Sequence, residues 1–286
     1  MRLLIFTLVL AGITIYVTTR TSSDSTKQEE WIPLFNGNDL ADWTPKFTGF
    51  PKGENYRSTF RVSDSLLQVS YSEYDTFRNE FGHLFYKTPY SHYRLRAIYR
   101  MGLEGTPGGA DWAFANNGLM LHCQSVESMG LEQEFPVSIE FQLLGGKGSG
   151  ERPTGNLCTP GCHVVVGDTL YTTHCTDFYK GPTFHGDQWV EVEALVLGDS
   201  VIHHIVEGDT VLSYIKPVIG GELKGLDTTQ IIAGTPMTEG YIAIQAESHL
   251  TEFKSIELLD LCGCMDKKAK NYKDYYVKDA PERCIY

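Results

Sequence analysis

The sequence lacks several features that mark large classes of proteins. It has no Gly-x-Ser-x-Gly motif, no glycine-rich phosphate loop, no internal repeat and no low-complexity tract. Without the first motif, a serine-nucleophile triad has no support. Between residues 31 and 261 no segment carries an apolar helical stripe longer than two turns. A helical domain is therefore not expected.

Positive charge is also scarce. The 286 residues include 24 Lys and Arg against 36 Asp and Glu, for a net charge of −12. The one basic cluster, at Lys267, Lys268, Lys270 and Lys273, indicates a solvated surface. Because phosphate binding needs clustered Lys and Arg, a nucleic-acid partner is not expected.

Alternation of apolar and polar residues is the dominant pattern. Residues 93–100 place Tyr and Leu on one face and Arg on the other. Residues 190–196 and 201–206 predict a hairpin across Gly198, Asp199 and Ser200, followed by a strand at 210–214. Many short strands joined by turns favour two packed antiparallel sheets, one of them concave.

Three longer stretches interrupt the alternation, at residues 44–58, 101–115 and 145–187. Loops of this length in a compact domain are usually functional or disordered. The third stretch contains Arg152, Asn156, His163, His174 and His185, and we interpret it as a functional loop.

The start of the chain predicts export. Arg2 precedes an apolar run at residues 3–17, which fits a signal-peptide core and falls short of the roughly 20 residues of a spanning helix. Residues 1–20 are therefore a signal peptide or an uncleaved N-terminal anchor, and residues 21–30 a polar linker. Either interpretation places the protein in the periplasm, on a membrane through residues 3–17, or outside the cell.

The cysteines agree with an oxidising compartment. There are seven, and either Cys158 or Cys162 is expected to pair with Cys175. Cys123 lies in a predicted strand and is expected to be a buried apolar residue. Zinc is disfavoured because Cys158 and Cys162 have no matching pair at zinc-site spacing.

The last residues, 262–286, resemble a short Cys-closed segment found at the ends of exported bacterial proteins. The resemblance rests on residues 263–266, on Asn271 and Tyr272, and on residues 284–286. It implies that Cys264 and Cys284 close this C-terminal tail.

Two strands carry candidate ligand-binding side chains. In residues 138–146 (SIEFQLLGG), Glu140 and Gln142 project together while the apolar residues pack the other way. Gln245 and Glu247 repeat this arrangement near the end of the domain. If the two strands are neighbours in the concave sheet, two carboxylates and two amides converge on one site. The alternative is that these residues cover a solvated sheet face.

His122 is the main histidine candidate, since it follows Asn116, Asn117 and Gly118 in a strand and shares a face with Met120. His163 could reach the edge of the site. The remaining strand histidines, His83, His92, His203, His204 and His249, are interpreted as surface or hairpin residues. Trp112 and Tyr71 could stack on a sugar ring, although buried packing explains either one.

Six segments together resemble the 3-keto-disaccharide hydrolase domain family. They are residues 34–43 (LFNGNDLADW), 117–119 (NGL), 138–146, 152–161 (RPTGNLCTPG), 189–192 (WVEV) and 240–247 (GYIAIQAE). The resemblance covers residues 31–261. It implies an all-β, concanavalin/glucanase-like jelly-roll sandwich of two antiparallel sheets that acts on sugars oxidised at carbon 3.

A 3-keto group acidifies the proton on carbon 2, so a base can remove it and the enolate can expel the group on carbon 1. Water then completes a net hydrolysis. The catalytic candidates are Glu140, His122 and Glu247, with Glu140 or His122 as the base. Arg152 or a metal would stabilise the enolate. The candidates for binding the oligosaccharide or glycoside substrate are Gln142, Gln245, Asn117, Arg152, His163 and Trp112.

No motif requires a cofactor, although convergent His and Glu side chains could bind a divalent metal. Two alternatives remain open. Glu140 and Glu247 could be the paired carboxylates of a conventional glycoside hydrolase, although Gln142 occupies a position where such enzymes carry an acid. The domain could instead be a non-catalytic carbohydrate-binding module.

Overall fold

The computed structural model describes residues 28–176, 180–229 and 231–286. The predicted signal peptide or anchor, and nearly all of the predicted linker, lie outside these residues. Within the described ranges, no helix has both the length and the apolar content needed to cross a membrane.

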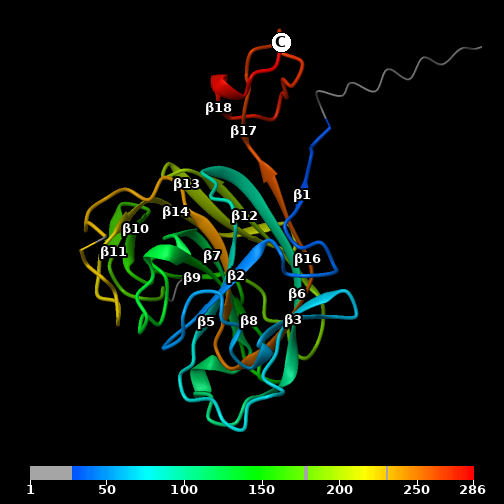
Figure 1. Ribbon diagram of the computed structural model, residues 1–286, viewed down its shortest axis with the longest axis vertical. Helices are drawn as coiled ribbons and strands as arrows, with labels where there is room; N and C mark the ends of the chain where they lie inside the picture. The colour runs from blue at the N-terminus through cyan, green and yellow to red at the C-terminus, as the bar shows by residue number, and fades with distance from the viewer. Residues whose placement is uncertain (1–27, 177–179, 230) are drawn as a thin grey trace, which may run out of the picture.

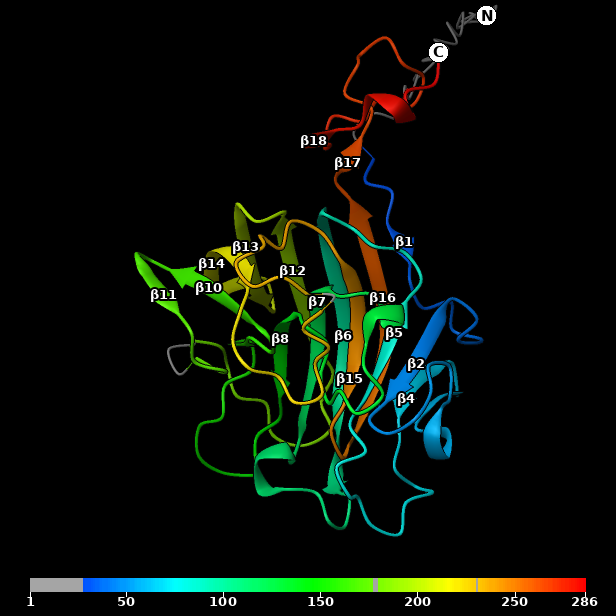
Figure 2. The same ribbon diagram turned by 60° about the vertical axis from the view of Figure 1, so that its left-hand side comes forward.

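Two large antiparallel sheets form the body of the protein (Figures 1 and 2). The larger sheet contains β1 (Ile32–Pro33), β3 (Phe60–Ser63), β4 (Leu66–Val69), β6 (His92–Gly105), β10 (Cys162–Val166), β11 (Thr169–Tyr171), β12 (Val190–Leu197), β13 (Val201–Val206), β14 (Asp209–Ile219) and β16 (His249–Asp260). Its strand order is β11-β10-β14-β13-β12-β6-β16-β4-β3, with β1 beside β16.

The smaller sheet has the order β2-β5-β15-β7-β8-β9. Its strands are β2 (Trp43–Phe47), β5 (Gly82–Tyr86), β7 (Asn116–Cys123), β8 (Ile139–Leu144), β9 (Asn156–Cys158) and β15 (Tyr241–Ala246). Short 3-10 helices lie in the connections, at η1 (Tyr56–Ser58), η2 (Asp111–Ala113), η3 (Val126–Ser128) and η4 (Pro281–Arg283). The predicted jelly-roll sandwich is confirmed.

The alternation seen in the sequence sorts side chains between core and surface. On β8, Ile139, Phe141 and Leu143 are fully buried in the core between the sheets. On β6, the predicted apolar face is buried in the same way, and the arginines point outward. Apolar burial contributes roughly 25 cal/mol per Å², so these inward faces supply most of the stabilisation.

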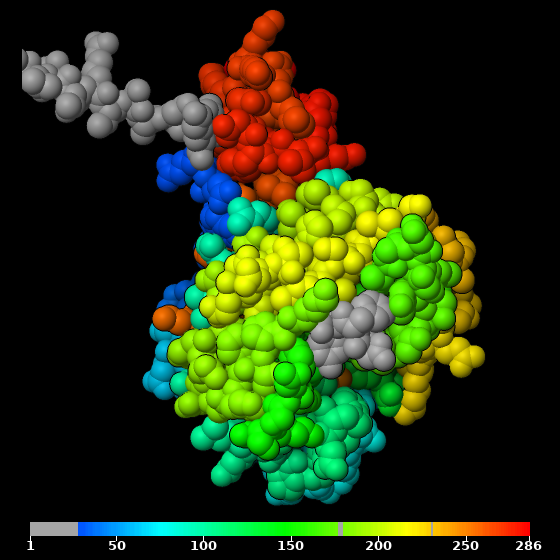
Figure 3. Space-filling view, turned by 180° about the vertical axis from the view of Figure 1, so that it is seen from behind, coloured from blue at the N-terminus to red at the C-terminus, as the bar shows by residue number. Residues whose placement is uncertain are grey.

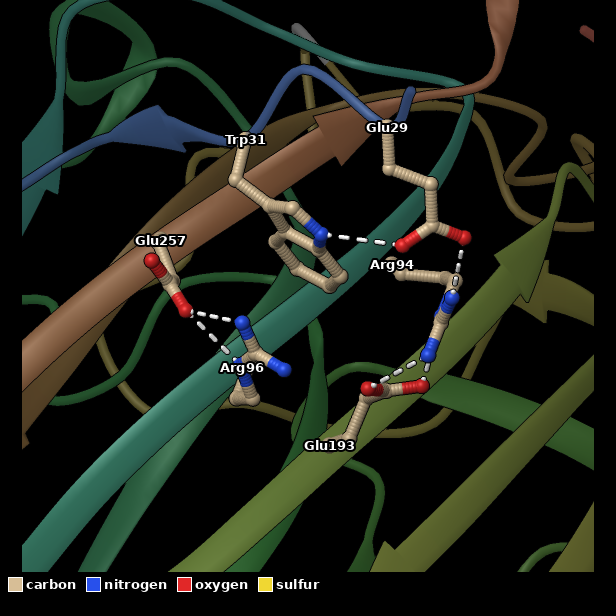
Figure 4. Close-up of polar contacts among 6 residues, drawn as sticks. All are labelled: Glu29, Trp31, Arg94, Arg96, Glu193 and Glu257. Atoms are coloured by element: carbon tan, nitrogen blue, oxygen red, sulfur yellow. Dashed lines mark hydrogen bonds and ion pairs between the residues drawn. The ribbon is translucent and has the colours of Figure 1, made fainter. Parts of the chain in front are cut away.

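The residues just before β1 lie across the outward arginines of β6 (Figure 4). Arg94 forms a two-pronged ion pair with Glu193, with Nε–Oε1 and Nη2–Oε2 distances of 2.8 and 3.0 Å, and it also contacts Glu29. The Arg96 guanidinium lies 4.2 Å from the ring centroid of Trp31. These contacts fix the start of the folded chain to the outer face of the larger sheet.

The C-terminal tail is a separate small body at one end of the sandwich, drawn in red in Figures 1 and 3. Its strands β17 (Cys262–Gly263) and β18 (Lys278–Asp279) pair in parallel. The predicted Cys264–Cys284 disulfide is confirmed. An ion pair of 3.0 Å between Arg283 and Asp260 connects the tail to the end of β16.

The second disulfide joins Cys158 to Cys175, so of the two predicted partners Cys158 is the one used. Cys162 is a buried thiol that contacts the carbonyl oxygen of Ser138. Cys123 is also buried, as predicted, and burial raises its pKa. Neither thiol is exposed enough to be reactive.

Part of the loop prediction is wrong. Residues 145–187 include the short strands β9, β10 and β11, and β6 continues to Gly105. Strands of three to five residues are too short to show a clear period of two, particularly among Gly, Pro and Thr. The segment is a mixture of short strands and connections.

We predict that the sandwich folds without the tail. Truncation after Leu261 removes the tail and its disulfide but leaves the strands of both large sheets intact. The truncated protein should unfold in one cooperative transition, as measured by calorimetry. A protein without a cooperative transition would show that the tail belongs to the folding unit.

Candidate active site

The outer face of the smaller sheet carries polar side chains at its centre. Gln142 of β8 pairs across the strands with Gly118 of β7 and with Asn156 of β9. Gln245 of β15 pairs with His83 of β5. The strands that carry Glu140 and Gln245 are not direct neighbours, because β7 lies between them. The side chains of Glu140 and Gln245 nevertheless approach each other, because residue 118 of β7 is a glycine.

Gly118 lets the Glu140 side chain cross β7. A Cβ atom at Gly118 would lie 2.7 Å from Cγ of Glu140 and 2.8 Å from its Oε1. Any larger residue at this position would collide with the carboxyl group. The Glu140 carboxyl therefore lies over β7 and approaches Gln245 and Glu247 on the far side.

A cavity of about 410 Å³ opens on this face, a volume within the usual range for ligand sites of roughly 300–1,000 Å³. Its lining residues are Asn79, Phe81, Trp112, Asn116, Glu134, Phe135, Glu140, Gln142, Cys158, His174, Cys175 and Glu247. The cavity thus brings together four residues predicted from the sequence, namely Glu140, Gln142, Glu247 and Trp112.

Glu140 is the most unusual group in the cavity. Its side chain is almost fully buried, and its Oε1 has no hydrogen-bond partner among the described residues. Burial raises the pKa of the carboxyl group from 4.5 to about 8, although the nearby Gln245 amide opposes this shift. A carboxyl group with this pKa can exchange a proton near neutral pH.

Glu247 is a second buried carboxyl group. Burial raises its pKa well above the ordinary value, and the charge of Glu140 raises it further. The Asn116 side chain donates a hydrogen bond of 2.8 Å to Oε2 of Glu247. Because two such close carboxylates repel each other, the pair holds at least one proton at neutral pH.

A chain of side-chain hydrogen bonds leads to Glu247 from β9. The Thr176 hydroxyl donates to Asn156, and the Asn156 amide donates to Oε1 of Gln142 at 3.1 Å. The Gln142 amide donates to Oδ1 of Asn116 at 3.3 Å, and Asn116 donates to Glu247. Every donor in the chain points toward the carboxyl group, so the chain fixes the orientation of Gln142 at the cavity floor.

Aromatic side chains form one wall of the cavity. The rings of Trp112 and Phe81 are stacked at 25° with centroids 6.3 Å apart, and Phe135 lies 5.2 Å from Phe81. Trp112 is 54% exposed, so buried packing does not explain it and sugar stacking stays a prediction, whereas Tyr71 is buried in the core. An exposed ring in a polar cavity is a suitable surface for the apolar face of a sugar.

Three predicted residues lie elsewhere. Asn117 points to the side of β7 opposite Asn116, where its amide donates to the backbone oxygen of Gln245. His122 is turned by a positive φ of 50° toward Tyr93 and the Gly198 carbonyl, away from the face it was predicted to share with Met120. His163 lies on β10 in the larger sheet. None of them lines the cavity.

Arg152 positions the cavity wall and does not line the cavity. Its guanidinium donates to the carbonyl oxygens of Ala115, Gly145 and Trp112 at 2.8, 2.6 and 3.1 Å. These bonds hold the segment that carries Trp112 against the end of β8. Arg152 was predicted to stabilise the enolate, but its guanidinium does not lie in the cavity.

Three of the histidines interpreted as surface or hairpin residues, His83, His204 and His249, are fully buried. His204 lies in the predicted hairpin, but its ring faces the core and stacks on Phe141. Among the cavity residues, the sequence analysis did not propose Asn79, Phe81, Asn116, Glu134 or Phe135 for the site, and it named His174 only as part of the functional loop. Asn116 could have been found, since it alternates with Gly118 and Met120 on one strand face. The others come from connections that only the fold brings to the sheet.

The described residues contain no group of three or more His, Cys, Asp and Glu placed to hold a metal ion. In the cavity, Glu140 and Glu247 are the close acidic pair, and His174 lies at the exposed rim. The donor set of the described residues therefore fits proton transfer better than metal binding.

Comparison with known proteins finds one family model and several similar folds. The family model of the 3-keto-alpha-glucoside-1,2-lyase-like domain matches residues 30–259. A crystal structure of a candidate glycosyl hydrolase from Parabacteroides distasonis is similar, with a TM-score of 0.50, 18% identity, and coverage of 83% of this chain and 97% of that chain. The carbohydrate-binding module CBM66 from Bacillus subtilis aligns with a TM-score of 0.44 and 9% identity over 78% and 98% of the two chains. No curated protein sequence matches significantly.

The raised pKa of Glu140 predicts a pH-dependent stability. Between pH 4.5 and about 8 the group is protonated in the folded protein and ionised in the unfolded chain. Its contribution to stability is therefore complete below pH 4.5 and is lost as the pH rises to about 8, by up to about 1.4 kcal/mol for each pH unit. Glu140→Gln should remove this loss and be the more stable protein above pH 8. Denaturant unfolding of both proteins from pH 5 to 9 measures the effect, and a difference that does not change with pH would contradict it.

Proposed function

This chain belongs to the 3-keto-alpha-glucoside-1,2-lyase-like domain family, and we propose that it is an exported enzyme that cleaves 3-keto-glycosides. The family supports a carbohydrate-related function. The observation that carries the proposed reaction is the buried Glu140 carboxyl, which has a free oxygen, a pKa near neutrality and a position in a cavity with an aromatic wall.

The reaction begins with proton transfer from carbon 2 of the sugar to the ionised Glu140. The electrons of the C2–H bond form a C2–C3 double bond, and those of the ketone move to its oxygen, which gives an enolate. When the ketone re-forms, the C1–O bond breaks, and the aglycone leaves and takes up a proton. Water adds to the resulting enone at carbon 1, so the net reaction is hydrolysis.

The other cavity residues provide binding. Gln142 is held by the hydrogen bonds from Asn156 and to Asn116, and it presents a fixed amide to sugar hydroxyl groups. Trp112 and Phe81 provide a stacking surface. Fixed groups of this kind reduce the entropy that must be lost when a substrate is oriented.

A conventional glycoside hydrolase is the second candidate, and the Glu140–Glu247 pair is the observation that favours it. One carboxyl group of such a pair is an acid with a raised pKa and the other is ionised. The two mechanisms differ in substrate. Elimination requires the ketone, whereas a two-carboxylate hydrolase acts on the parent glycoside.

We expect Glu140→Gln to lower turnover of a 3-keto-α-glucoside by roughly 10²-fold or more, because Gln keeps the shape but cannot accept a proton. Wild-type activity should rise with pH up to about 8, since the base must be ionised. Initial rates from pH 5 to 9 measure both effects. Near-normal turnover by Glu140→Gln would show that Glu140 is not the base.

Two further variants separate the mechanisms. Glu247→Gln should lose much less activity than Glu140→Gln in an elimination enzyme, and as much in a two-carboxylate hydrolase. Gly118→Ala should act like Glu140→Gln, since the added Cβ displaces the Glu140 carboxyl. A protein that binds sugars but cleaves neither oxidised nor parent glycosides would be a carbohydrate-binding module.

Export is supported by the disulfides Cys158–Cys175 and Cys264–Cys284, since such bonds persist in oxidising compartments. We predict that both pairs resist a thiol-reactive reagent in fractionated cells and that the protein is recovered outside the cytoplasm. Recovery in the cytoplasm with every cysteine labelled would overturn this prediction. The same fractionation shows whether residues 3–17 attach the protein to a membrane.

A further inference from the structure

Gln245, close to Glu140, and His83, beside Gln245, are fully buried polar side chains with unused hydrogen-bonding groups. Both ring nitrogens of His83, and both amide atoms of Gln245, lack a hydrogen-bond partner of ordinary geometry among the described residues. The two residues face each other across β5 and β15. Gln245 lies close enough to the Glu140 carboxyl to lower its pKa. The three side chains therefore form one continuous polar strip on the sheet.

This strip is costly for a purely structural element. A buried polar group without a partner has lost its hydrogen bonds to water and gained none in return. His204 shows the usual arrangement in the same protein, because its ring nitrogens contact the Gly155 carbonyl at 3.0 Å and the Tyr214 hydroxyl at 2.9 Å. His83 has no such contacts among the described residues, and a catalytic role is one of the explanations for a buried polar group of this kind.

Phe135 lies between His83 and the cavity. Its ring lies edge-on to His83 with centroids 5.5 Å apart, and it also lines the cavity. The backbone around it is fixed, since the Gln133 side chain donates to the Phe135 carbonyl at 2.7 Å and the Val137 amide donates to Gln124 at 2.7 Å. The Phe135 ring is therefore the group that contacts both His83 and the cavity.

The proposed elimination needs hydrogen-bond donors where negative charge develops on the ketone oxygen. Arg152 does not line the cavity, and its guanidinium donates to three backbone carbonyls. Lys46 of β2 lies opposite His83 of β5 in the sheet. Its ammonium group donates to the carbonyls of Phe47 and Leu131. Gln245 carries an unused donor close to the proposed base, and His83 carries one beside Gln245.

We infer that the Gln245 amide and the His83 ring form the pocket that binds the ketone oxygen of the sugar and stabilises the enolate, with Phe135 as its gate. This inference rests on the proposed function. Burial and the charge of Lys46 lower the pKa of His83 to about 3, so the ring is neutral and offers one donor and one acceptor. A neutral donor stabilises the enolate through a hydrogen bond and keeps its own proton.

The test uses apolar replacements of similar shape, His83→Phe and Gln245→Met. Each should lower kcat for a 3-keto-α-glucoside by roughly 10²–10³-fold, the usual effect of losing one such donor. Each should also slow exchange of the carbon 2 proton with deuterated water, which reports enolate formation directly. Thermal stability should be unchanged or higher, because an unpaired polar group is removed.

His204→Phe is the matched control, because His204 is equally buried but has both ring nitrogens bonded. It should lower thermal stability, while its folded fraction keeps the wild-type rate of proton exchange. Wild-type turnover with near-normal exchange in both His83→Phe and Gln245→Met would overturn the inference and leave the proposed function intact. A wild-type protein that neither cleaves nor exchanges the sugar would overturn the proposed function itself.

If either variant fails to fold, the wild-type protein provides the deciding measurement. The ring Cε1–H resonance of His83 should shift when a 3-keto-α-glucoside is added at saturation, and it should shift much less with the parent glucoside. Catalytic turnover without any shift of this resonance would exclude His83 from the ketone pocket.

Discussion

Burial of two neighbouring carboxyl groups is the constraint around which the cavity is built. Glu140 and Glu247 are both withdrawn from water on the outer face of a sheet, and the charge of one raises the pKa of the other. Such a pair is stable only if it keeps a proton or receives hydrogen bonds. Asn116 donates to Glu247, whereas Glu140 keeps one oxygen free. This asymmetry gives the two acids different chemical roles.

The fold can hold two buried carboxyl groups because the inner and outer faces of the smaller sheet differ in composition. Apart from Asn117, the inner side chains of β7, β8 and β15 are buried apolar residues that pack against the larger sheet. The outer side chains of the same strands carry the amides and acids of the cavity. A rigid apolar layer thus lies directly beneath the polar residues and fixes their positions, which is the support that a preorganised site requires.

The fold was largely predictable, and the site only in part. A period of two over residues 93–100 and 190–206 is a local property of the chain, and the strands and hairpins follow from it. The pairing of Glu140 with Glu247 could be proposed because each shares a strand face with a glutamine. His83 was misinterpreted, since no local pattern shows that residues 131–136 fold over its strand and bury it. His122 was misplaced because a positive φ at the end of β7 turns its side chain.

The sequence by itself determined which side chains share a strand face, because alternation depends only on neighbours along the chain. It therefore determined the all-β class, the inward apolar faces, and the common direction of Glu140 and Gln142. The tertiary structure decided which strands lie side by side. It thereby placed Gly118 between Glu140 and Glu247, which are 107 positions apart in the sequence. It also decided which polar groups lose water without gaining a partner, because burial depends on contacts between segments that are distant in sequence.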